Sequence, residues 1–357
     1  MKIIIPLVVG FGRHGGFRVL SQLANHWMRD GHEVSFLVFK NSDEPYFPTT
    51  AEIVWYDEKG NILDTTERIK QSKFFLGILE IRKGLTKALN KLEADIVLAT
   101  QNFSADPVAK SKIKAKKYYY IQAYEPEFYE KGPLHYKVYH WIAKRSYKKN
   151  LIPIVNSKMY FNYREIRSDK LVYPGLDFKL FHPKENKARN EVFRFGTIGR
   201  KEEIKGTAYV IEAFRKARAE LGDKIELVIA FGDEAGGAIE GVRMEFPKND
   251  AELAAYYQNL DCYLCGGTWQ LDAVHYPVIE SMACKVPVIT TGYYPANNQN
   301  AYIVPVKNAD AMGEAIIEVF NSEKMANEKA EIAFQQIQEF SWDNVSEKML
   351  SIFNSSN

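Results

Sequence analysis

Hydrophobic and polar residues follow one another along the chain in two patterns, which predict strands and helices in turn. Short apolar runs bounded by turn residues predict buried strands, whereas apolar residues three or four positions apart predict helices. The first half has predicted strands at 2–9, 33–39, 52–56, 96–99, 117–122 and 151–156, and predicted helices at 17–29 and 77–92. This alternation is typical of a parallel sheet with helices on both faces.

The pattern starts again after a turn-rich segment at 173–183 and a polar stretch at 184–190. The second half repeats the alternation, with predicted strands at 193–198, 226–231, 260–265, 286–290 and 302–305. A last helix is predicted from Ser341 to the end, with Val345, Met349 and Ile352 on one face. Because 357 residues are too many for one ordinary core, we predict an α/β protein with two domains, 1–172 and 173–340, followed by the segment 341–357.

Composition and charge exclude several classes of protein. The chain is 46% apolar, as an ordinary globular protein is, and its 47 basic and 45 acidic residues leave a net charge of +2. This balance gives no overall electrostatic reason to expect a nucleic-acid partner. No apolar run reaches the roughly 18 residues of a membrane-spanning helix, and the N-terminal segment is typical of a buried strand rather than a signal peptide. We expect a cytoplasmic protein.

The three cysteines, Cys262, Cys265 and Cys284, are too few for a disulfide framework and are typical of a reducing compartment. Cys262 and Cys265 have the spacing of a metal or redox pair. However, they fall inside a predicted strand, where residues three apart point to opposite faces, and no second pair completes four ligands. We predict that they are buried and structural, and we expect no metal site.

A glycine-rich loop, 10–16, lies between the first predicted strand and the first predicted helix. Gly15 and Gly16 lie just before that helix, where backbone N–H groups can approach a phosphate or a sugar closely. The glycines do not have the spacing of a dinucleotide-binding loop, and no acidic residue follows the second strand promptly to hold a ribose. The alternative is a tight turn that needs glycine only for its geometry.

Two further segments of the first half are candidates for binding. The loop after the strand at 117–122 is rich in carboxylates and aromatic rings, which suit a hydroxyl-rich ligand, and we select Gln122, Tyr124 and Glu125; ordinary loop chemistry around Pro126 is the alternative. The run 134–151 combines apolar positions at helical spacing with several basic residues. It predicts either a basic amphipathic helix that contacts an anionic membrane surface or a core-packed helix with a solvated face.

The second half contains a candidate site for a nucleotide-sugar. Gly199-Arg200 and Lys205-Gly206 follow a strand and precede a helix at 208–219, so two cations can hold a diphosphate near a helix N-terminus. Asp272 and Glu280 bracket a short loop that follows another strand, and Glu280 is predicted to begin a helix. Both carboxylates are expected at the carboxyl-end rim of the sheet, where they can accept hydrogen bonds from vicinal hydroxyls.

Together these residues resemble the retaining glycosyltransferases of family 4, which have the GT-B architecture of two Rossmann-like domains facing across a cleft. The resemblance covers nearly the whole chain. Its matching segments are the glycine loop Gly15-Gly16, the interdomain motif at 174–183, the diphosphate pair Arg200 and Lys205-Gly206, the carboxylate motif 272–280 with the helix and strand that follow to 289, and the start of the last helix at 340–342. In that family the last helix packs back on the first domain.

The chain departs from the family pattern at the donor loop. The first motif glutamate is Asp272, the usual Gly-Phe-Gly is Ala273-Val274-His275, and a usual glycine is Lys285. In the family this loop presents backbone amides to the donor sugar, so His275 is expected to alter which sugar fits. The histidine that the family has at the end of a first-domain strand corresponds to Gln122 or a neighbour.

The resemblance implies a retaining enzyme that moves a hexosyl or deoxyhexosyl group from a nucleoside diphosphate sugar to a hydroxyl of a glycan or lipid-linked acceptor, in cell-surface polysaccharide synthesis. Arg200, Lys205 and a helix N-terminus would stabilise the leaving diphosphate without a metal or another cofactor. Glu280 would hold the ribose and Asp272 a donor-sugar hydroxyl. The implied location is the cytoplasm, and a peripheral position on the inner face of the membrane is a second expectation.

Two alternatives stay open at this point. A GT-B sugar-nucleotide epimerase would consume the donor without an acceptor. A degenerate, non-catalytic GT-B accessory subunit would explain Asp272 and the missing glycines, although a degenerate site usually loses its charges first and Arg200, Lys205 and Glu280 are retained.

Overall fold

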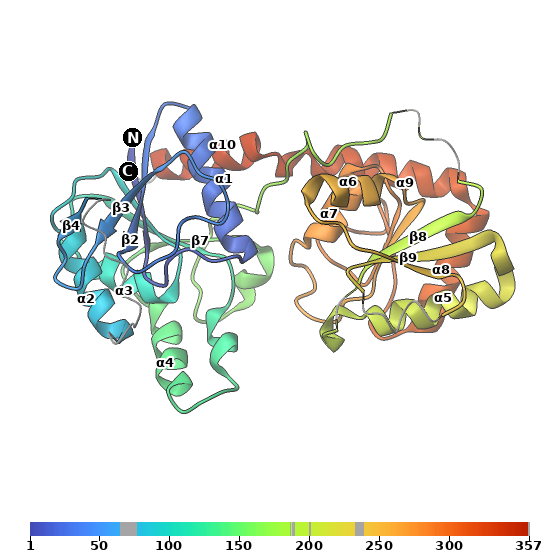
Figure 1. Ribbon diagram of the computed structural model, residues 1–357, viewed down its shortest axis with the longest axis horizontal. Coiled ribbons are helices and arrows are strands. Elements are labelled where there is room, and N and C mark those ends of the chain that lie inside the picture. Colours follow the sequence, from blue (N-terminus) through green and yellow to red (C-terminus); the bar gives the residue numbers. More distant parts are fainter. Residues whose placement is uncertain (65–76, 186, 188–189, 200, 233–238, 356–357) are drawn as a thin grey trace. The chain divides into compact units, whose positions relative to one another are not determined.

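The structure is a computed structural model that describes residues 1–64, 77–185, 187, 190–199, 201–232 and 239–355. The chain divides into two compact units: Met1–Gly175 with Trp342–Asn357, and Leu176–Ser341 (Figure 1). The change of unit therefore falls after Gly175, where the sequence pattern placed it at residue 173. Each unit is an α/β domain, which confirms the predicted fold class.

The first unit is built on a sheet with the strand order β4-β3-β2-β1-β5-β6-β7, seven strands among the described residues. All neighbouring strands are parallel except β3 and β4, which are antiparallel. The strands are β1 (Lys2–Leu7), β2 (Glu33–Phe39), β3 (Glu52–Tyr56), β4 (Ile62–Leu63), β5 (Ile96–Ala99), β6 (Lys116–Ile121) and β7 (Ile152–Val155). The predicted strands at 33–39, 52–56 and 96–99 have these same bounds.

Helices cover both faces of this sheet. The helices are α1 (Gly15–Arg29), α2 (Ile78–Leu89), α3 (Asn102–Lys110), α4 (Tyr136–Ser146) and α10 (Trp342–Ser355), with the 3-10 turns η2 (Glu125–Tyr129) and η3 (Lys158–Asn162). α1 and α10 share one core with the sheet, in which Trp27 lies against Phe353. The helices α2, α3 and α4 share the other core. On α10 the buried apolar residues are Trp342, Val345, Met349 and Phe353, whereas Ile352, predicted on the same face as Val345 and Met349, is only partly buried.

Helix α3 was not among the predicted helices, and it contains Pro107. A proline cannot donate its hydrogen bond to the carbonyl four residues earlier. In this helix that carbonyl belongs to Phe103, and it accepts a hydrogen bond from Nε of Arg82 at 3.0 Å. A side chain from α2 therefore replaces the missing backbone donor, and the helix continues through the proline.

The second unit is a parallel sheet with the order β10-β9-β8-β11-β12-β13, six strands among the described residues. The strands are β8 (Phe193–Ile198), β9 (Ile225–Ala230), β10 (Val242–Glu245), β11 (Cys262–Cys265), β12 (Val288–Thr290) and β13 (Tyr302–Ile303). The helices are α5 (Thr207–Leu221), α6 (Asp250–Gln258), α7 (Tyr276–Ala283), α8 (Ala309–Asn321) and α9 (Glu323–Gln336), with the 3-10 turns η4 (Glu203–Lys205), η5 (Gly222–Lys224) and η7 (Ile337–Phe340).

Both sheets have a point at which the order of their strands reverses. In the first unit it lies between β1 and β5, and in the second between β8 and β11. At such a point the connections after the two strands leave in opposite directions, which opens a crevice at their carboxyl ends. Most of the candidate site residues follow these strands, whereas Gln122, Tyr124 and Glu125 follow β6, next to β5.

Candidate functional site

The segment of the second unit that we predict to hold a diphosphate, residues 199–206, follows β8. Gly199 is buried directly after the strand, Arg200 lies outside the described residues, and Lys205 is exposed at the end of η4. Gly206 then begins α5 in a left-handed conformation with φ 73°. Thus Lys205 lies at the carboxyl end of the sheet, immediately before a helix N-terminus, as predicted.

Gly206 is pressed against the loop that follows β11. A Cβ atom at this position would lie 1.8 Å from the carbonyl oxygen of Gly266, so only glycine fits. Beside this contact, the N–H of Thr268 donates to the carbonyl of Ile204 at 2.9 Å. The start of α5 and the β11 loop are therefore held together across the crevice. The first turn of α5 contains no acidic residue, so the positive end of its dipole has no carboxylate in that turn.

Asp272 lies in the same β11 loop and is exposed. Its backbone is left-handed, with φ 68°, a conformation that aspartate tolerates better than most residues. Its N–H donates to the carbonyl of Gly292 at 3.1 Å, and the carbonyl of Ala273 accepts from Tyr294 at 3.1 Å. Val274 forms an isolated bridge with Tyr294 as well. The loop 272–275 is thus held by backbone contacts to the segment that follows β12.

His275 is packed into the wall of this loop. Its ring stacks on Tyr293, with centroids 4.5 Å apart and planes at 24°, and its Nδ1 lies 3.8 Å from Sγ of Cys265. It is also the N-cap residue of α7 and makes no side-chain capping hydrogen bond. The histidine that replaces a family glycine is accommodated by stacking on a tyrosine.

Glu280 does not begin a helix, which corrects the sequence prediction. Helix α7 begins at Tyr276, with a proline in its first turn, a position where proline is well tolerated. Glu280 therefore lies one turn inside α7 and is only 4% exposed. It lies near Tyr257 of α6, and burial, together with this carboxylate, raises the pKa of Tyr257 well above its ordinary value.

A pocket of ≈ 710 Å³ opens beside this crevice, within the second unit. Phe231 and Phe246, which follow β9 and β10, contribute exposed rings to it, and Phe231 has a left-handed backbone with φ 58°. Its other walls come from β9, β10 and the residue Gly232, and from the segment between β8 and the first turns of α5: Ile229, Gly232, Met244, Gly199, Lys201, Glu202, Glu203, Thr207, Ala208, Tyr209 and Ile211. The sequence pattern did not single out the two phenylalanines: Phe231 lies at the end of an apolar predicted strand, and Phe246 follows β10, whose alternating Val-Arg-Met-Glu was not predicted as a strand.

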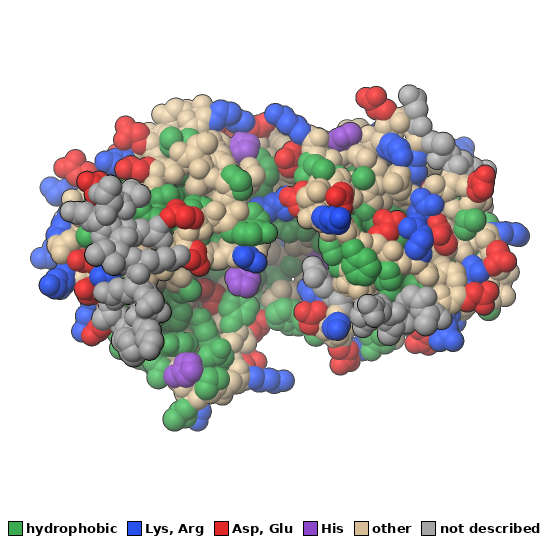
Figure 2. Space-filling view, viewed as in Figure 1, with side chains coloured by type: hydrophobic (Ala, Val, Ile, Leu, Met, Phe, Trp, Pro, Cys, Tyr) green, Lys and Arg blue, Asp and Glu red, His purple; other side chains and the backbone are tan. Residues whose placement is uncertain are grey.

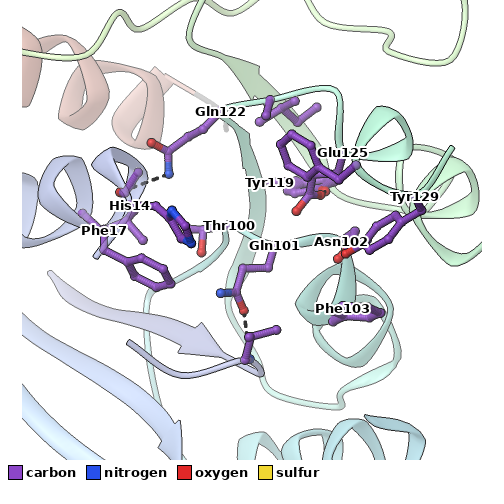
Figure 3. A pocket seen from close by; sticks show the side chains of 16 residues that line it. His14, Phe17, Thr100, Gln101, Asn102, Phe103, Tyr119, Gln122, Glu125 and Tyr129 are labelled. Carbon is purple, nitrogen blue, oxygen red and sulfur yellow. Dashed lines mark hydrogen bonds between the residues drawn. The ribbon is translucent and has the colours of Figure 1, made fainter. Parts of the chain in front are cut away.

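The first unit has its own pocket, of ≈ 580 Å³, at the carboxyl ends of β1, β5 and β6 (Figure 3). We call it the first-unit pocket. Three segments line it: Val9, His14, Gly16, Phe17 and Leu20 after β1; Thr100 to Phe103 after β5; and Tyr119, Ile121, Gln122, Ala123, Glu125, Phe128 and Tyr129 from β6 onward. It therefore lies at the reversal of strand order in this sheet.

Gly16 and Gln122 meet in this pocket. Nε2 of Gln122 donates to the Gly16 carbonyl at 3.4 Å, and a Cβ atom on Gly16 would contact the Gln122 amide at 3.4 Å. Gly15 is the exposed first residue of α1 and does not line the pocket, since a Cβ atom there would meet nothing within 4 Å. Of the two glycines, Gly16 is the one that contributes to the pocket wall.

Glu125 lies on the far side of the pocket from Phe17 (Figure 3). Tyr119 Oη donates to its Oε2 at 2.8 Å, and burial raises the pKa of this carboxyl to about 7. Tyr124 instead packs behind the pocket, where its ring stacks on Tyr147 with centroids 5.7 Å apart and burial raises its pKa to about 12. Of the predicted trio, Gln122 and Glu125 line the pocket and Tyr124 supports it.

The three cysteines are free and buried, which confirms the structural interpretation. Burial raises the pKa of the Cys265 thiol to about 11. Over the described part of the chain, no group of three or more His, Cys, Asp and Glu side chains is arranged to hold a metal ion. No helix in that part is long and apolar enough to cross a membrane.

Residues 178–336 match the family model described as glycosyl transferases group 1. Among curated protein sequences, none matches the chain significantly. Solved structures similar to it over 99% of its length include HepE from Anabaena in complex with UDP (15% identity, TM-score 0.73, 100% of that chain covered). Others are a sucrose-phosphate synthase from Thermosynechococcus elongatus (16%, 0.68, 98% covered) and a glycosyltransferase from Rickettsia africae (17%, 0.67, 98% covered). The chain therefore has the fold of the GT-B glycosyltransferases, and most of its second unit matches the group 1 family.

Proposed function

We propose that this protein is a retaining glycosyltransferase of family 4. It transfers a hexosyl or deoxyhexosyl group from a nucleoside diphosphate sugar to a hydroxyl of a glycan or lipid-linked acceptor, in the synthesis of a cell-surface polysaccharide. It acts in the cytoplasm, in peripheral contact with the inner face of the membrane. The HepE structures hold UDP, UDP with glucose, and UDP-glucose, which supports a uridine diphosphate sugar as the donor.

One observation carries this proposal: the groups that a nucleotide-sugar needs converge on one edge of the second sheet. Lys205, the N-terminus of α5 and the Asp272 loop lie at the carboxyl ends of β8 and β11, joined by the contact between Gly206 and Gly266. Beside them, the rings of Phe231 and Phe246 border a pocket that suits a planar nucleobase.

The leaving diphosphate gains negative charge as the glycosidic bond breaks. Groups that are fixed in place before the reaction stabilise such charge most effectively. Lys205 would supply a point charge, Arg200 a bidentate fork, and the start of α5 the positive end of its dipole. The acceptor proton passes to the donor phosphate, so no protein side chain is assigned as the general base.

The two carboxylates bind different parts of the donor in this proposal. Glu280, on the buried side of α7, holds the ribose, which does not react. Asp272, in the exposed loop, holds a hydroxyl of the transferred sugar. Backbone groups of Ala273 and Val274 and the ring of His275 shape the sugar site. Gly199, directly after β8, contributes to the binding of the diphosphate.

The first-unit pocket is assigned to the acceptor. Aromatic rings such as Phe17 and Tyr129 offer faces on which a sugar ring packs, and Gln122 and Glu125 offer hydrogen bonds to its hydroxyls. Gly15 and Gly16 at the start of α1 lie at the phosphate-binding end of that helix.

Incubation with a panel of nucleoside diphosphate sugars, with and without hydroxyl acceptors, tests the function. A transferase releases nucleoside diphosphate faster when an acceptor is present and forms a glycosylated product. An epimerase converts the donor without any acceptor, and an accessory subunit leaves every donor intact. Either of the last two results would overturn the proposal.

Removal of divalent metal is expected to leave nucleoside diphosphate binding unchanged, because two side-chain cations do the work of a metal at the diphosphate. Calorimetric titration of uridine diphosphate with and without EDTA measures this. Loss of binding in EDTA would replace the metal-free mechanism by one that needs a bound cation.

The substitution Arg200→Ala is expected to weaken diphosphate binding by about 1.5–3 kcal/mol, the usual contribution of a hydrogen bond to a charged group. Arg215→Ala is the matched control, since Arg215 is an exposed arginine of α5 two turns beyond the site. Equal affinities for the two variants would remove Arg200 from the site.

A further inference from the structure

Helix α4 of the first unit has an outer face that no described residue of this unit covers. Leu134, just before the helix, is 77% exposed, Val138 is 51% exposed and Trp141 is 58% exposed. These positions are four and three residues apart and share one side of the helix. The opposite side, with Ile142, Ala143 and Ser146, is buried in the core. Figure 1 shows α4 standing out from the body of this unit.

The same segment carries charge of one sign only. Residues 131–149 contain six lysines and arginines and no acidic residue: Lys131, Lys137, Lys144, Arg145, Lys148 and Lys149. Five of these are exposed, whereas Lys149 is partly buried and paired with Asp106. The guanidinium of Arg145 lies 4.8 Å from the centre of the Trp141 ring, so cation and apolar ring share the outer face. In Figure 2, hydrophobic side chains at this end of the unit have Lys or Arg beside them.

We propose that the outer face of α4, defined by Leu134, Val138, Trp141 and the exposed cations of 131–148, docks on the surface of an anionic lipid bilayer. A helix with exposed apolar side chains flanked by lysines lies in the plane of a bilayer, where its apolar groups enter the headgroup boundary. Tryptophan is the side chain most suited to that depth. The lysines are attracted to anionic headgroups. The charged surface of an acidic protein would attract the lysines, but it would not give Leu134, Val138 and Trp141 the apolar surroundings that a bilayer provides.

The docking face adjoins the first-unit pocket. Phe128, 56% exposed, lines that pocket and belongs to η2, against which α4 packs. Phe103, another lining residue, contacts Tyr139 on the inner side of α4 with ring centroids 5.2 Å apart. From this proximity we infer that the acceptor is lipid-linked, an inference that rests on the proposed transferase function. The head group of the acceptor enters the first-unit pocket while its lipid stays in the bilayer that contacts α4.

Flotation of the full-length protein with phosphatidylcholine vesicles, with and without phosphatidylglycerol, tests the docking without any substrate. The protein is expected to float with the anionic vesicles and much less with the neutral ones. Charge reversal by Lys137→Glu with Lys144→Glu should weaken binding at least about thirtyfold, since each cation near an anionic bilayer contributes about 1 kcal/mol and 1.4 kcal/mol is tenfold. Lys83→Glu with Lys87→Glu is the matched control, because these exposed lysines of α2 give the same change in net charge.

Quenching by brominated lipid tests which side chain enters the bilayer. Wild-type tryptophan fluorescence should be partly quenched by brominated anionic vesicles, and Trp141→Phe should abolish most of that quenching while still floating. Equal flotation of the two charge-reversed proteins, or unchanged quenching in Trp141→Phe, would overturn the docking face. Since flotation needs no donor or acceptor, a protein that floats but transfers no sugar would refute the transferase function and leave the docking face supported. If the protein self-associates through Trp141 and does not float with anionic vesicles, the proposed docking face is wrong.

Discussion

Asp272→Asn is expected to slow sugar transfer by about a hundredfold while leaving the affinity for free nucleoside diphosphate unchanged. The side chain is assigned to a hydroxyl of the transferred sugar, and a hydrogen bond to a charged group contributes about 1.5–3 kcal/mol. An interaction with the reacting sugar affects transfer without adding to the binding of a product that lacks it. Asparagine is the right replacement, because it tolerates the left-handed backbone at φ 68° and alanine does not.

Glu280→Gln is expected to behave differently, with both nucleotide affinity and transfer reduced by about tenfold. Its carboxylate is assigned to the ribose, which is present in donor and product alike. Glutamine keeps the volume of a side chain that is only 4% exposed, so no cavity forms. Calorimetry with uridine diphosphate and a transfer assay on both variants separate the two roles.

Glu314→Gln, an exposed carboxylate on α8 of the same unit, is the control for loss of one negative charge. Melting temperatures of all three variants show whether the fold is intact. If Asp272→Asn and Glu280→Gln lower only the stability, by about 1 kcal/mol, and the folded variants keep full activity, both carboxylates have only structural roles.

Glu125→Gln is expected to stabilise the first unit at pH 8 by about 3 kcal/mol and to have little effect at pH 4.5. Burial raises the pKa of this carboxyl from 4.5 to about 7 in the folded protein. The protonated form therefore contributes stability that is fully present below about pH 4.5 and is lost as the pH rises through about 7. Glutamine is neutral at every pH and still accepts the hydrogen bond of Tyr119. Denaturant unfolding between pH 4.5 and pH 8 measures the difference between the two proteins.

Glu58→Gln provides a control of opposite sign in the same unit. The side-chain hydrogen bond from Lys40 is the largest cause that lowers the pKa of Glu58, and the ion pair spans 2.8 Å. Its stabilising contribution is present above the ordinary carboxyl pKa and is lost as the pH falls. A stability difference between wild type and Glu125→Gln that is the same at pH 4.5 and pH 8 would show that Glu125 is not held in its protonated form.

The strands other than β4 and β10, and the position of the Lys205-Gly206 turn, could be predicted from sequence because each depends on local chemistry. Buried parallel strands are short apolar runs, and predicted ranges such as 193–198 match the structure. The position of Lys205 and Gly206 between a strand and a helix was predicted correctly, because the apolar patterns of both elements define the short turn that joins them.

The rest depends on contacts between segments distant in sequence. Helix α3 continues through Pro107, where Arg82 supplies a donor from another helix to the carbonyl that the proline leaves unpaired. The residues after β5 that line the first-unit pocket, Thr100 to Phe103, were missed for the same reason, since only the sheet order brings them beside Gly16 and Gln122. The elevated pKa of Glu125 likewise comes from burial that no local pattern records.

The chain leaves the first unit and re-enters it at neighbouring points. In the second unit, the N–H of Leu176 donates to the carbonyl of Phe340 at 2.7 Å, and Leu176 bridges Ser341. In the first unit, Gly175 lies so close to Trp342 that a Cβ atom would fall 2.3 Å from the indole ring. The second unit is thus a compact insertion into the first, and its first and last residues lie next to each other. Its coding segment could be exchanged between related enzymes as a cassette whose ends lie at residues 176 and 341.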